Sequence, residues 1–293
     1  MSDLAALTSL SSALSTAVAG ATPALVSVHS HRSRASGFVW KPGLIVTADE
    51  ALADDGEIAL VFADGTSKPA TIAGRDHTTD IALLRFEAAG VPSGVAPVTL
   101  ATEVPALGSL AVIVAADHGT PTAALAMVSK SAGRWRSMRG GEIDTRIELD
   151  GRLRHSQQGG LALNAAGQAI GMPVLGPRRT LVIPAATIVR VASRLETHGR
   201  IARGYLGAGL QQVEYADGVG AMVMSVDKAG PAATAGLRQG DVITTFNKES
   251  FSGVRGMVRE LGPESVGDVV EVAALRGGEA MTFSLVIGER PER

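Results

Sequence analysis

The sequence predicts a mainly β protein, made of two small β-barrels followed by a separate α+β unit. The chain of 293 residues contains 35 Gly, and Val, Ile, Leu and Ala are frequent. This composition indicates many short strands joined by tight turns. Strand-like runs between turn residues recur from Ala24 onward, and the pattern changes in character after Arg203. A chain of this length is expected to form two or three compact units.

Residues 1–20 are predicted to form an N-terminal helix. Leu7, Leu10, Leu14 and Val18 recur at helical spacing, which indicates an amphipathic docking helix. No run reaches the roughly 18 uninterrupted apolar residues of a membrane span. Asp3 stands where a secretory leader would carry positive charge. We therefore expect no membrane span and a cytoplasmic location, or a periplasmic one if a leader has been removed.

The next segments are predicted to form the two barrels. Residues 21–92 contain six short β-rich runs separated by turns such as Pro42-Gly43 and Asp64-Gly65, as in a small antiparallel barrel. Residues 93–108 contain Pro and interrupt this pattern, so they are expected to link the barrels. Residues 109–200 are expected to form the second barrel and a closing helix, which begins near Pro184 and ends at Gly199. Residues 203–290 alternate strands with two short helices and form the α+β unit.

Composition narrows the classes of function. The net charge of −2 gives no reason to expect nucleic acid as a partner. The absence of Cys excludes disulfides, thiolate metal sites and a cysteine nucleophile. His29 and His31 face the same side of a predicted strand, but no third metal ligand can be named. We therefore expect no metal site and no cofactor.

Several motifs resemble one known family. GLIVTADEAL, GRDHTTDIALLRF and SQQGGLALNAAGQAIGM occur in this order and resemble the segments around the triad His, Asp and Ser of the HtrA family. Members of that family are trypsin-like proteases with C-terminal PDZ domains. GYLGAGL, GPAATAGLRQGDVITTFN and VGDVVEVAALRGGE resemble its PDZ domain. The resemblance implies a chymotrypsin/trypsin-like double β-barrel followed by an α+β PDZ domain.

Transfer of the triad onto this sequence gives an unusual set of side chains. The His position falls on Glu50, the Asp position on Asp80 and the Ser position on Gln158, while Ser156 falls on the oxyanion-hole Gly. Acyl transfer at such a site uses a hydroxyl nucleophile and an imidazole base. A Gln amide is neither a nucleophile nor titratable near neutral pH. The sequence therefore predicts a pseudoprotease without catalytic residues.

Two alternatives to that prediction are open. One is a hydrolase of altered chemistry that uses Glu50, Asp80 and Ser156, with His155 nearby. The other is a metal-binding scaffold based on the two carboxylates, which would share a proton or bind a cation. A further interpretation is that Glu50 hydrogen-bonds Gln158 or a basic neighbour and fills the ancestral site.

The PDZ segment predicts a peptide site. The successive N–H groups of Tyr205, Leu206, Gly207 and Ala208 can surround the carboxylate of a peptide C-terminus. The helix that flanks the groove would line the pocket for the last side chain with Val254, Met257, Val258 and Leu261. We expect peptides or protein C-termini as partners and a role as chaperone, adaptor or regulator in protein quality control. An active HtrA-type relative and further copies of the chain are the other expected partners.

Overall fold

The computed structural model describes residues 2–31, 33–54, 56–216, 218–250 and 253–291. It divides into two compact units, Met1–Ile201 and Ala202–Arg293. The first contains two closed six-stranded barrels and the second an open antiparallel sheet with short helices. The predicted double β-barrel followed by a separate α+β unit is confirmed.

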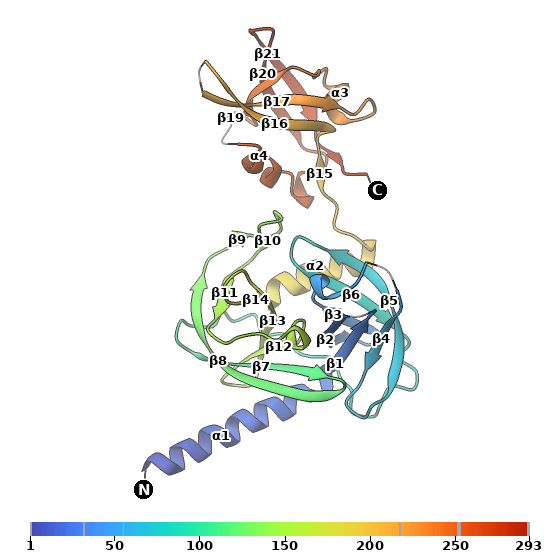
Figure 1. The fold of residues 1–293 in the computed structure, drawn as a ribbon, viewed down its shortest axis with the longest axis vertical. Helices are drawn as coiled ribbons and strands as arrows, with labels where there is room; N and C mark the ends of the chain where they lie inside the picture. Colours follow the sequence, from blue (N-terminus) through green and yellow to red (C-terminus); the bar gives the residue numbers. More distant parts are fainter. Residues whose placement is uncertain (1, 32, 55, 217, 251–252, 292–293) are drawn as a thin grey trace. The chain divides into compact units, whose positions relative to one another are not determined.

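The chain begins with α1 (Ser2–Ala21), which the 3-10 turn η1 (Thr22–Ala24) connects to the first barrel (Figure 1). Leu14 and Val18 pack against the core, whereas Leu7 and Leu10 are exposed. Only the last turns of the predicted helix are therefore docked. By length and composition, Leu4–Ala24 also qualifies as a membrane-crossing helix, a test that signal sequences near an N-terminus pass as well. The expectation of no membrane span therefore stays a prediction.

The first barrel is entirely antiparallel. Its strands are β1 (Leu25–Ser30), β2 (Ser33–Lys41), β3 (Leu44–Thr47), β4 (Ile58–Val61), β5 (Ser67–Asp76) and β6 (Ile81–Phe86). They close in the order β1-β2-β3-β6-β5-β4. A short 3-10 turn, η2 (Asp49–Ala51), begins two residues after the end of β3. Glu50 belongs to this turn, so its backbone is held close to the end of β3.

The second barrel is also closed and antiparallel, and it carries an inserted hairpin. Its strands are β7 (Leu110–Asp117), β8 (Thr120–Ala132), β11 (Arg146–Leu149), β12 (Leu161–Asn164), β13 (Ala169–Leu175) and β14 (Thr180–Pro184). They close in the order β11-β14-β13-β12-β7-β8. A small hairpin of β9 (Trp135–Arg136) and β10 (Glu142–Ile143) is inserted after β8, and the 3-10 turn η3 (His155–Gln157) precedes β12.

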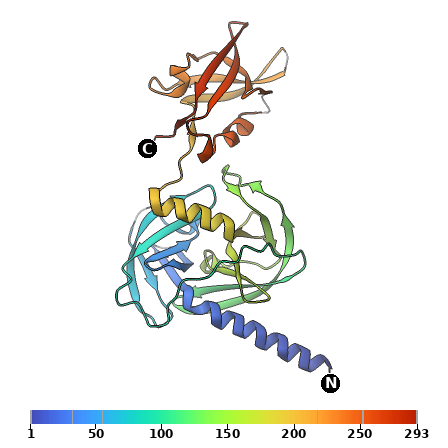
Figure 2. The same ribbon diagram turned by 180° about the vertical axis from the view of Figure 1, so that it is seen from behind.

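The predicted closing helix is confirmed as α2 (Ala185–His198), which ends at Gly199 in a left-handed conformation with φ 71°. Glycine suits this C-terminal position because it has no Cβ. The helix packs against β5 and β6 of the first barrel and against β13 and β14 of the second (Figure 2). It therefore fixes the two barrels to each other.

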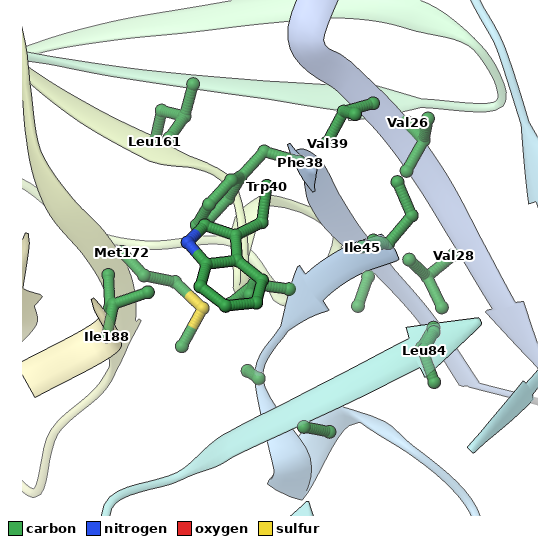
Figure 3. Packing of buried hydrophobic residues seen from close by; sticks show 14 of the residues in the cluster. Val26, Val28, Phe38, Val39, Trp40, Ile45, Leu84, Leu161, Met172 and Ile188 are labelled. Atoms are coloured by element: carbon green, nitrogen blue, oxygen red, sulfur yellow. The ribbon is translucent and has the colours of Figure 1, made fainter. Parts of the chain in front are cut away.

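One hydrophobic cluster extends through both barrels. Figure 3 shows Phe38 and Trp40 of β2 close to Met172 of the second barrel and Ile188 of α2. Burial of such large apolar side chains is the main favourable contribution to folding, about 1.5–3 kcal/mol for each. A shared core holds the facing loops of the two barrels in one arrangement, and these loops form the first candidate site.

The second unit is an antiparallel sheet with short helices, and it has its own hydrophobic cluster. Its elements are β15 (Gly204–Tyr205), β16 (Ala208–Tyr215), β17 (Gly218–Val226), α3 (Pro231–Thr234), β18 (Val242–Phe246), β19 (Glu249–Ser250), α4 (Val254–Glu260), η4 (Pro263–Ser265), β20 (Val269–Arg276), β21 (Glu279–Val286) and β22 (Gly288–Glu289). The main sheet has the order β16-β17-β18-β20-β21, so β16 is an edge strand. Helix α4 contacts this edge strand.

Candidate functional sites

Glu50 and Asp80 are neighbours in the first candidate site. Glu50 belongs to η2, and Asp80 ends the turn between β5 and β6, with a left-handed backbone at φ 58°. The Glu50 N–H donates a hydrogen bond of 2.7 Å to Asp80 Oδ1, and the Asp49 N–H donates one of 3.4 Å to Asp80 O. The two residues are therefore joined through the backbone of η2 and the Asp80 carboxylate.

Asp80 has an unusual affinity for protons. Burial raises the pKa of its carboxyl to about 7, and the negative charges of Glu50 and Asp49 act in the same direction. The hydrogen bond from Glu50 N–H and the charge of Arg139 oppose this rise. A carboxyl group that titrates near neutral pH is suited to proton transfer.

The Glu50 side chain pairs with a basic neighbour from the second barrel. Its Oε1 lies 2.7 Å from Arg139 Nη2, at the tip of the β9–β10 hairpin. Arg139 Nη1 also donates to His77 O at 3.2 Å, and Ser137 Oγ donates to Thr78 O at 2.6 Å. The hairpin is thus fastened to the turn that carries Asp80. Of the partners considered for Glu50, the structure places Arg139 against it.

The Gln158 side chain bonds to the backbone of its own barrel. Its side chain is buried, and Oε1 accepts the Leu175 N–H at 3.2 Å. Its backbone N–H donates to His155 O at 3.2 Å, within the η3 turn. Next to it, Gly159 has φ +84°, and a Cβ there would lie 2.3 Å from Ser36 O, so the close approach of β2 requires glycine. Among the described contacts, none joins the Gln158 amide to Glu50 or Asp80.

Ser156 and His155 belong to a neighbouring part of the site. Ser156 lies in η3, where Ser36 Oγ donates to its carbonyl oxygen at 2.6 Å. Both residues line a polar pocket together with His118 of the β7–β8 turn. Within the described residues, no contact links this pair to the Glu50 and Asp80 carboxylates.

A charged cluster that was not predicted from the sequence lies under this site. Asp49 is 1% exposed, and its carboxylate lies 2.5 Å from Arg75 Nε and 2.5 Å from His77 Nδ1. Arg75 also donates to Asp49 O at 3.2 Å. The cluster holds η2 against the end of β5. The sequence Arg-Asp-His at the end of a predicted strand indicated charged side chains there. It could not show that Asp49 lies next to Arg75 and His77.

The metal-binding alternative is not supported by any set of ligands in the described part of the chain. No group of three or more His, Asp or Glu side chains is placed there to hold a metal ion. His29 packs edge-to-face against His118, with ring centroids 5.2 Å apart and planes at 73°. It therefore acts as a packing residue and not as a partner of His31.

The second candidate site begins at the loop between β15 and β16. Gly207 has φ +72°, and a Cβ there would lie 2.9 Å from Gly230 Cα. The carbonyls of this loop are used internally, since Gly207 O accepts the Asp227 N–H at 2.8 Å and Leu206 O accepts the Ala232 N–H at 2.7 Å. The N–H groups of Leu206 and Gly207 have no acceptor among the described residues. They remain available to an anionic group.

Helix α4 contacts β16, the strand that follows this loop. Met257 is buried, Val254 and Leu261 are half-buried, and all three belong to the core cluster of this unit. Leu206 and the half-buried Ala208 belong to the same cluster, next to the free N–H groups. The Val258 side chain lies outside the described residues. Five of the residues expected in this site therefore share one cluster, whereas the Tyr205 hydroxyl donates to Asp227 Oδ2 at 3.3 Å.

Comparison with protein families assigns both units. Residues 35–172 match a trypsin-like peptidase domain, and residues 204–287 match a PDZ domain. Among curated relatives, a probable periplasmic serine endoprotease DegP-like from Rhizobium meliloti is 26% identical over 89% of this chain and 54% of its own. Another from Bartonella henselae is 28% identical over 90% and 55%. The chain therefore spans about half the length of these relatives. The serine endoprotease DegS of Escherichia coli is 26% identical over 94% of this chain and 85% of its own.

Solved structures have the same fold. The crystal structure of the serine endoprotease from Yersinia pestis superposes with a TM-score of 0.72, at 24% identity, over 94% of this chain and 97% of that one. The HtrA-type protease AlgW, solved with a decapeptide, gives a TM-score of 0.72 at 22% identity over 94% and 98%. At these identities, the likeness shows the fold.

These findings correct two expectations. The prediction that the chain is not an enzyme is contradicted, because its relatives are named serine endoproteases. That prediction followed from the side-chain types at Glu50, Ser156 and Gln158, whereas the same site holds a carboxyl, that of Asp80, with its pKa raised to about 7. The cytoplasmic location is not supported either, since the DegP-like relatives are named periplasmic and the apolar N-terminal helix passes the test that signal sequences pass, despite Asp3. With its peptidase domain followed by a PDZ domain, the chain has the architecture of the HtrA family of trypsin-like serine proteases.

Proposed function

We propose that this chain binds peptides or protein C-termini through its PDZ domain. The observation that supports this most directly is the pair of N–H groups on Leu206 and Gly207 that lack an acceptor among the described residues. Successive N–H groups in such a loop form an anion-binding concavity, and a terminal carboxylate fits it. AlgW, which shares the fold, has been solved with a decapeptide and with a tripeptide.

The rest of the ligand would extend along the edge strand. β16 is at the edge of the sheet, so a peptide can pair with it as an added strand. The apolar side chains of Leu206, Met257 and Leu261 would enclose the last side chain of the peptide. Peptides with an apolar last residue and a free carboxylate are therefore the expected ligands.

Fluorescence anisotropy with labelled peptides tests this site. A peptide ending in a free apolar residue is expected to bind at least about tenfold more tightly than its C-terminally amidated form, because two charge-assisted hydrogen bonds are lost on amidation. Gly207→Ala is expected to abolish the difference, since φ +72° and the contact with Gly230 leave no room for a Cβ. Gly240→Ala is the matched control, because Gly240 also has a positive φ of +92° but open space around it. Equal binding of both peptides to the unmodified chain would refute the proposal.

The biological role follows from what is bound. Capture of exposed protein ends suits a chaperone, adaptor or regulator in protein quality control, and the names of the DegP-like relatives suggest the periplasm. Association with an HtrA-type protease or with further copies of the chain is part of the same proposal. Co-purification from a periplasmic extract, with and without Gly207→Ala, tests whether such partners depend on the groove.

Peptide hydrolysis is a second candidate function. The raised pKa of Asp80 favours it, and the relatives are named endoproteases. Because position 158 carries an amide, the groups available for the chemistry are the carboxylates of Glu50 and Asp80 and the hydroxyl of Ser156. Cleavage of casein that falls at least about 100-fold in Asp80→Asn would support a role for Asp80 in proton transfer. The same measurement on Ser156→Ala, with fluorophosphonate labelling, tests the hydroxyl as nucleophile. Turnover unchanged in both variants would rule out this assignment.

A further inference from the structure

A pocket in the PDZ unit is formed largely by residues outside the proposed peptide site. Its volume is about 550 Å³, and it is lined by α3, by the end of β21, by β22 and by Tyr205 and Asp227. Among the described residues, Tyr205 is the only lining residue that was also expected in the peptide site, and none comes from β16 or α4. The peptide site therefore does not account for this pocket.

The pocket lies at the free edge of the main sheet, which is β21. On the side of β20, the Ile287 N–H donates to Asp268 O at 2.8 Å and Ile287 O accepts the Gly267 N–H at 2.8 Å. Because backbone groups alternate between the two sides of an antiparallel strand, Ser284 and Val286 direct their N–H and C=O groups to the open side. No partner for these groups lies among the described residues. They are available to pair with an added strand.

This edge is apolar, and it lacks the features that usually prevent pairing with another chain. Val286 is 55% exposed, and its partner on β20, Val269, is 66% exposed. Natural edge strands are commonly protected by charged side chains, by Pro or by a bulge. Residues 280–286 contain no charged residue and no Pro, and their pairing with β20 is regular. The edge is therefore suited to a partner strand.

The side chains around the pocket are acidic. Asp227 and Glu289 line it, and no Lys, Arg or His is among its described lining residues. The Asp227 carboxylate accepts the Tyr205 hydroxyl at 3.3 Å and the Ala229 N–H at 3.2 Å, and both donors are uncharged. Within the described part of the chain, no basic side chain lies within 4.0 Å of this carboxylate. The negative charge of Asp227 is therefore not balanced in the pocket.

The backbone holds this carboxylate in place. The Asp227 N–H donates to Gly207 O at 2.8 Å, and Asp227 O accepts the Gly230 N–H at 2.9 Å. On the other side of the pocket, a Cβ on Gly288 would lie 2.8 Å from Pro231 Cγ, so β22 and α3 are in close contact. A site that is ordered before its ligand arrives loses less conformational entropy on binding.

We propose that the free edge of β21 binds an extended protein segment as an added strand, and that a basic side chain of this segment occupies the pocket beside Asp227. Arg suits the pocket best, because its planar guanidinium can bond to both oxygens of a carboxylate. Side chains of an added strand alternate between its two faces, so every second one can reach the pocket face of Ser284 and Val286. The site goes beyond the proposed function, since it requires no free C-terminus.

Fluorescence anisotropy with a matched pair of peptides tests this docking. Both peptides are labelled, C-terminally amidated and rich in β-branched residues, and they differ only at one central position, which carries Arg or its uncharged isostere citrulline. The Arg peptide is expected to bind the full chain about threefold or more tightly at low salt. This preference is expected to decrease as salt is added, because salt screens the attraction between the guanidinium and Asp227.

Two variants separate the charge from the strand edge. Asp227→Asn is expected to remove the preference for Arg, because the amide keeps an acceptor oxygen but has no charge. Glu279→Gln, the same loss of charge at the exposed first residue of β21, is the matched control. Ser284→Pro is expected to weaken binding of both peptides about tenfold, because it removes an N–H that faces the open edge and is not used in the ladder with β20. Unchanged thermal unfolding in both variants confirms that the fold is retained.

The same measurements distinguish other occupants. Displacement of the Arg peptide by an unlabelled peptide with a free apolar C-terminus would place both ligands in the peptide site and overturn the proposal. Equal binding of the Arg and citrulline peptides, equal effects of Asp227→Asn and Glu279→Gln, or full competition by free arginine amide at the same concentration would also overturn it. Sedimentation that shows a dimer, lost in Ser284→Pro, would assign the edge to a second copy of the chain instead.

Discussion

Asp80 links the pH of the solution to the stability of the peptidase unit. Its folded-state pKa of about 7 is above the value of 3.8 expected for an exposed Asp, so the folded chain binds a proton that the unfolded chain releases. The folded state is therefore favoured less as the pH rises from about 4 to 7. The whole difference corresponds to roughly 4 kcal/mol, because one pKa unit is worth about 1.4 kcal/mol.

We predict that Asp80→Asn is more stable than the unmodified chain above pH 7, by on the order of 3 kcal/mol, and that this advantage shrinks toward pH 4. The Asn oxygen can still accept the Glu50 N–H, and Asn tolerates the left-handed backbone. Urea unfolding from pH 4 to 8 measures the effect. Asp54→Asn is the control, because that side chain is 93% exposed. A gain that is the same at all pH values would refute the linkage.

A second prediction concerns the buried cluster around Asp49. Arg75→Ala removes the guanidinium that contacts both the carboxylate and the backbone carbonyl of Asp49, and leaves only His77 beside the carboxylate. Loss of one partner from a buried ion pair is expected to cost on the order of 3 kcal/mol. Urea unfolding at pH 7 measures this, with Arg194→Ala as control. A cost below about 0.5 kcal/mol, typical of surface residues, would show that the cluster is not structural.

Residue-level contacts were only partly predictable from the sequence. Glu50 and Asp80 could be paired because each belongs to a motif of known context. Arg139 and Asp49 could not, since their partners lie far away in the sequence and meet only when two barrels and a hairpin pack together. The free N–H groups of Leu206 and Gly207 were foreseeable, because a glycine in the turn before a strand allows the positive φ that turns successive N–H groups outward.

Among the elements of the peptidase unit, β2, β7 and η3 are joined by one buried hydroxyl group, that of Ser36. We predict that Ser36→Ala destabilises the peptidase unit by about 1–3 kcal/mol, because the Ala116 N–H and the Ser156 carbonyl would be buried without their partner. Ser109→Ala is the control, since the Ser109 hydroxyl bonds locally within an exposed turn. Equal stability of the two variants by urea unfolding would contradict the joining role of Ser36.

Periodicity predicted the elements that bury a regular face and failed for the others. The barrel strands and α2 were foreseeable because alternating or helical patterns run through them. The β9–β10 hairpin has two-residue strands, which are too short for any periodic signal, and its position depends on Thr78 and His77 of the other barrel. The N-terminal helix was predicted, but its docking was overestimated because leucine spacing does not reveal how far the helix follows the core.

At the scale of the whole molecule, the two units have separate hydrophobic cores. The PDZ unit buries its own cluster, which includes Val223, Ile243 and Leu285. Its sheet is complete within residues 204–289, so no strand from the peptidase unit is required to close it. A domain of this size can bury enough apolar surface to fold alone. The change in sequence pattern after Arg203 reflects this independence.

We therefore predict that residues 202–293, produced alone, fold cooperatively and bind the free-carboxylate peptide with a Kd within about twofold of the full chain, since the groove uses only residues of this unit. Thermal unfolding by circular dichroism and the same anisotropy titration measure both properties. The isolated unit carrying Gly207→Ala is the control for specific binding. A cooperative transition with binding weakened tenfold or more would mean that the peptidase unit completes the groove, whereas absence of a cooperative transition would mean that the PDZ core alone does not suffice for folding.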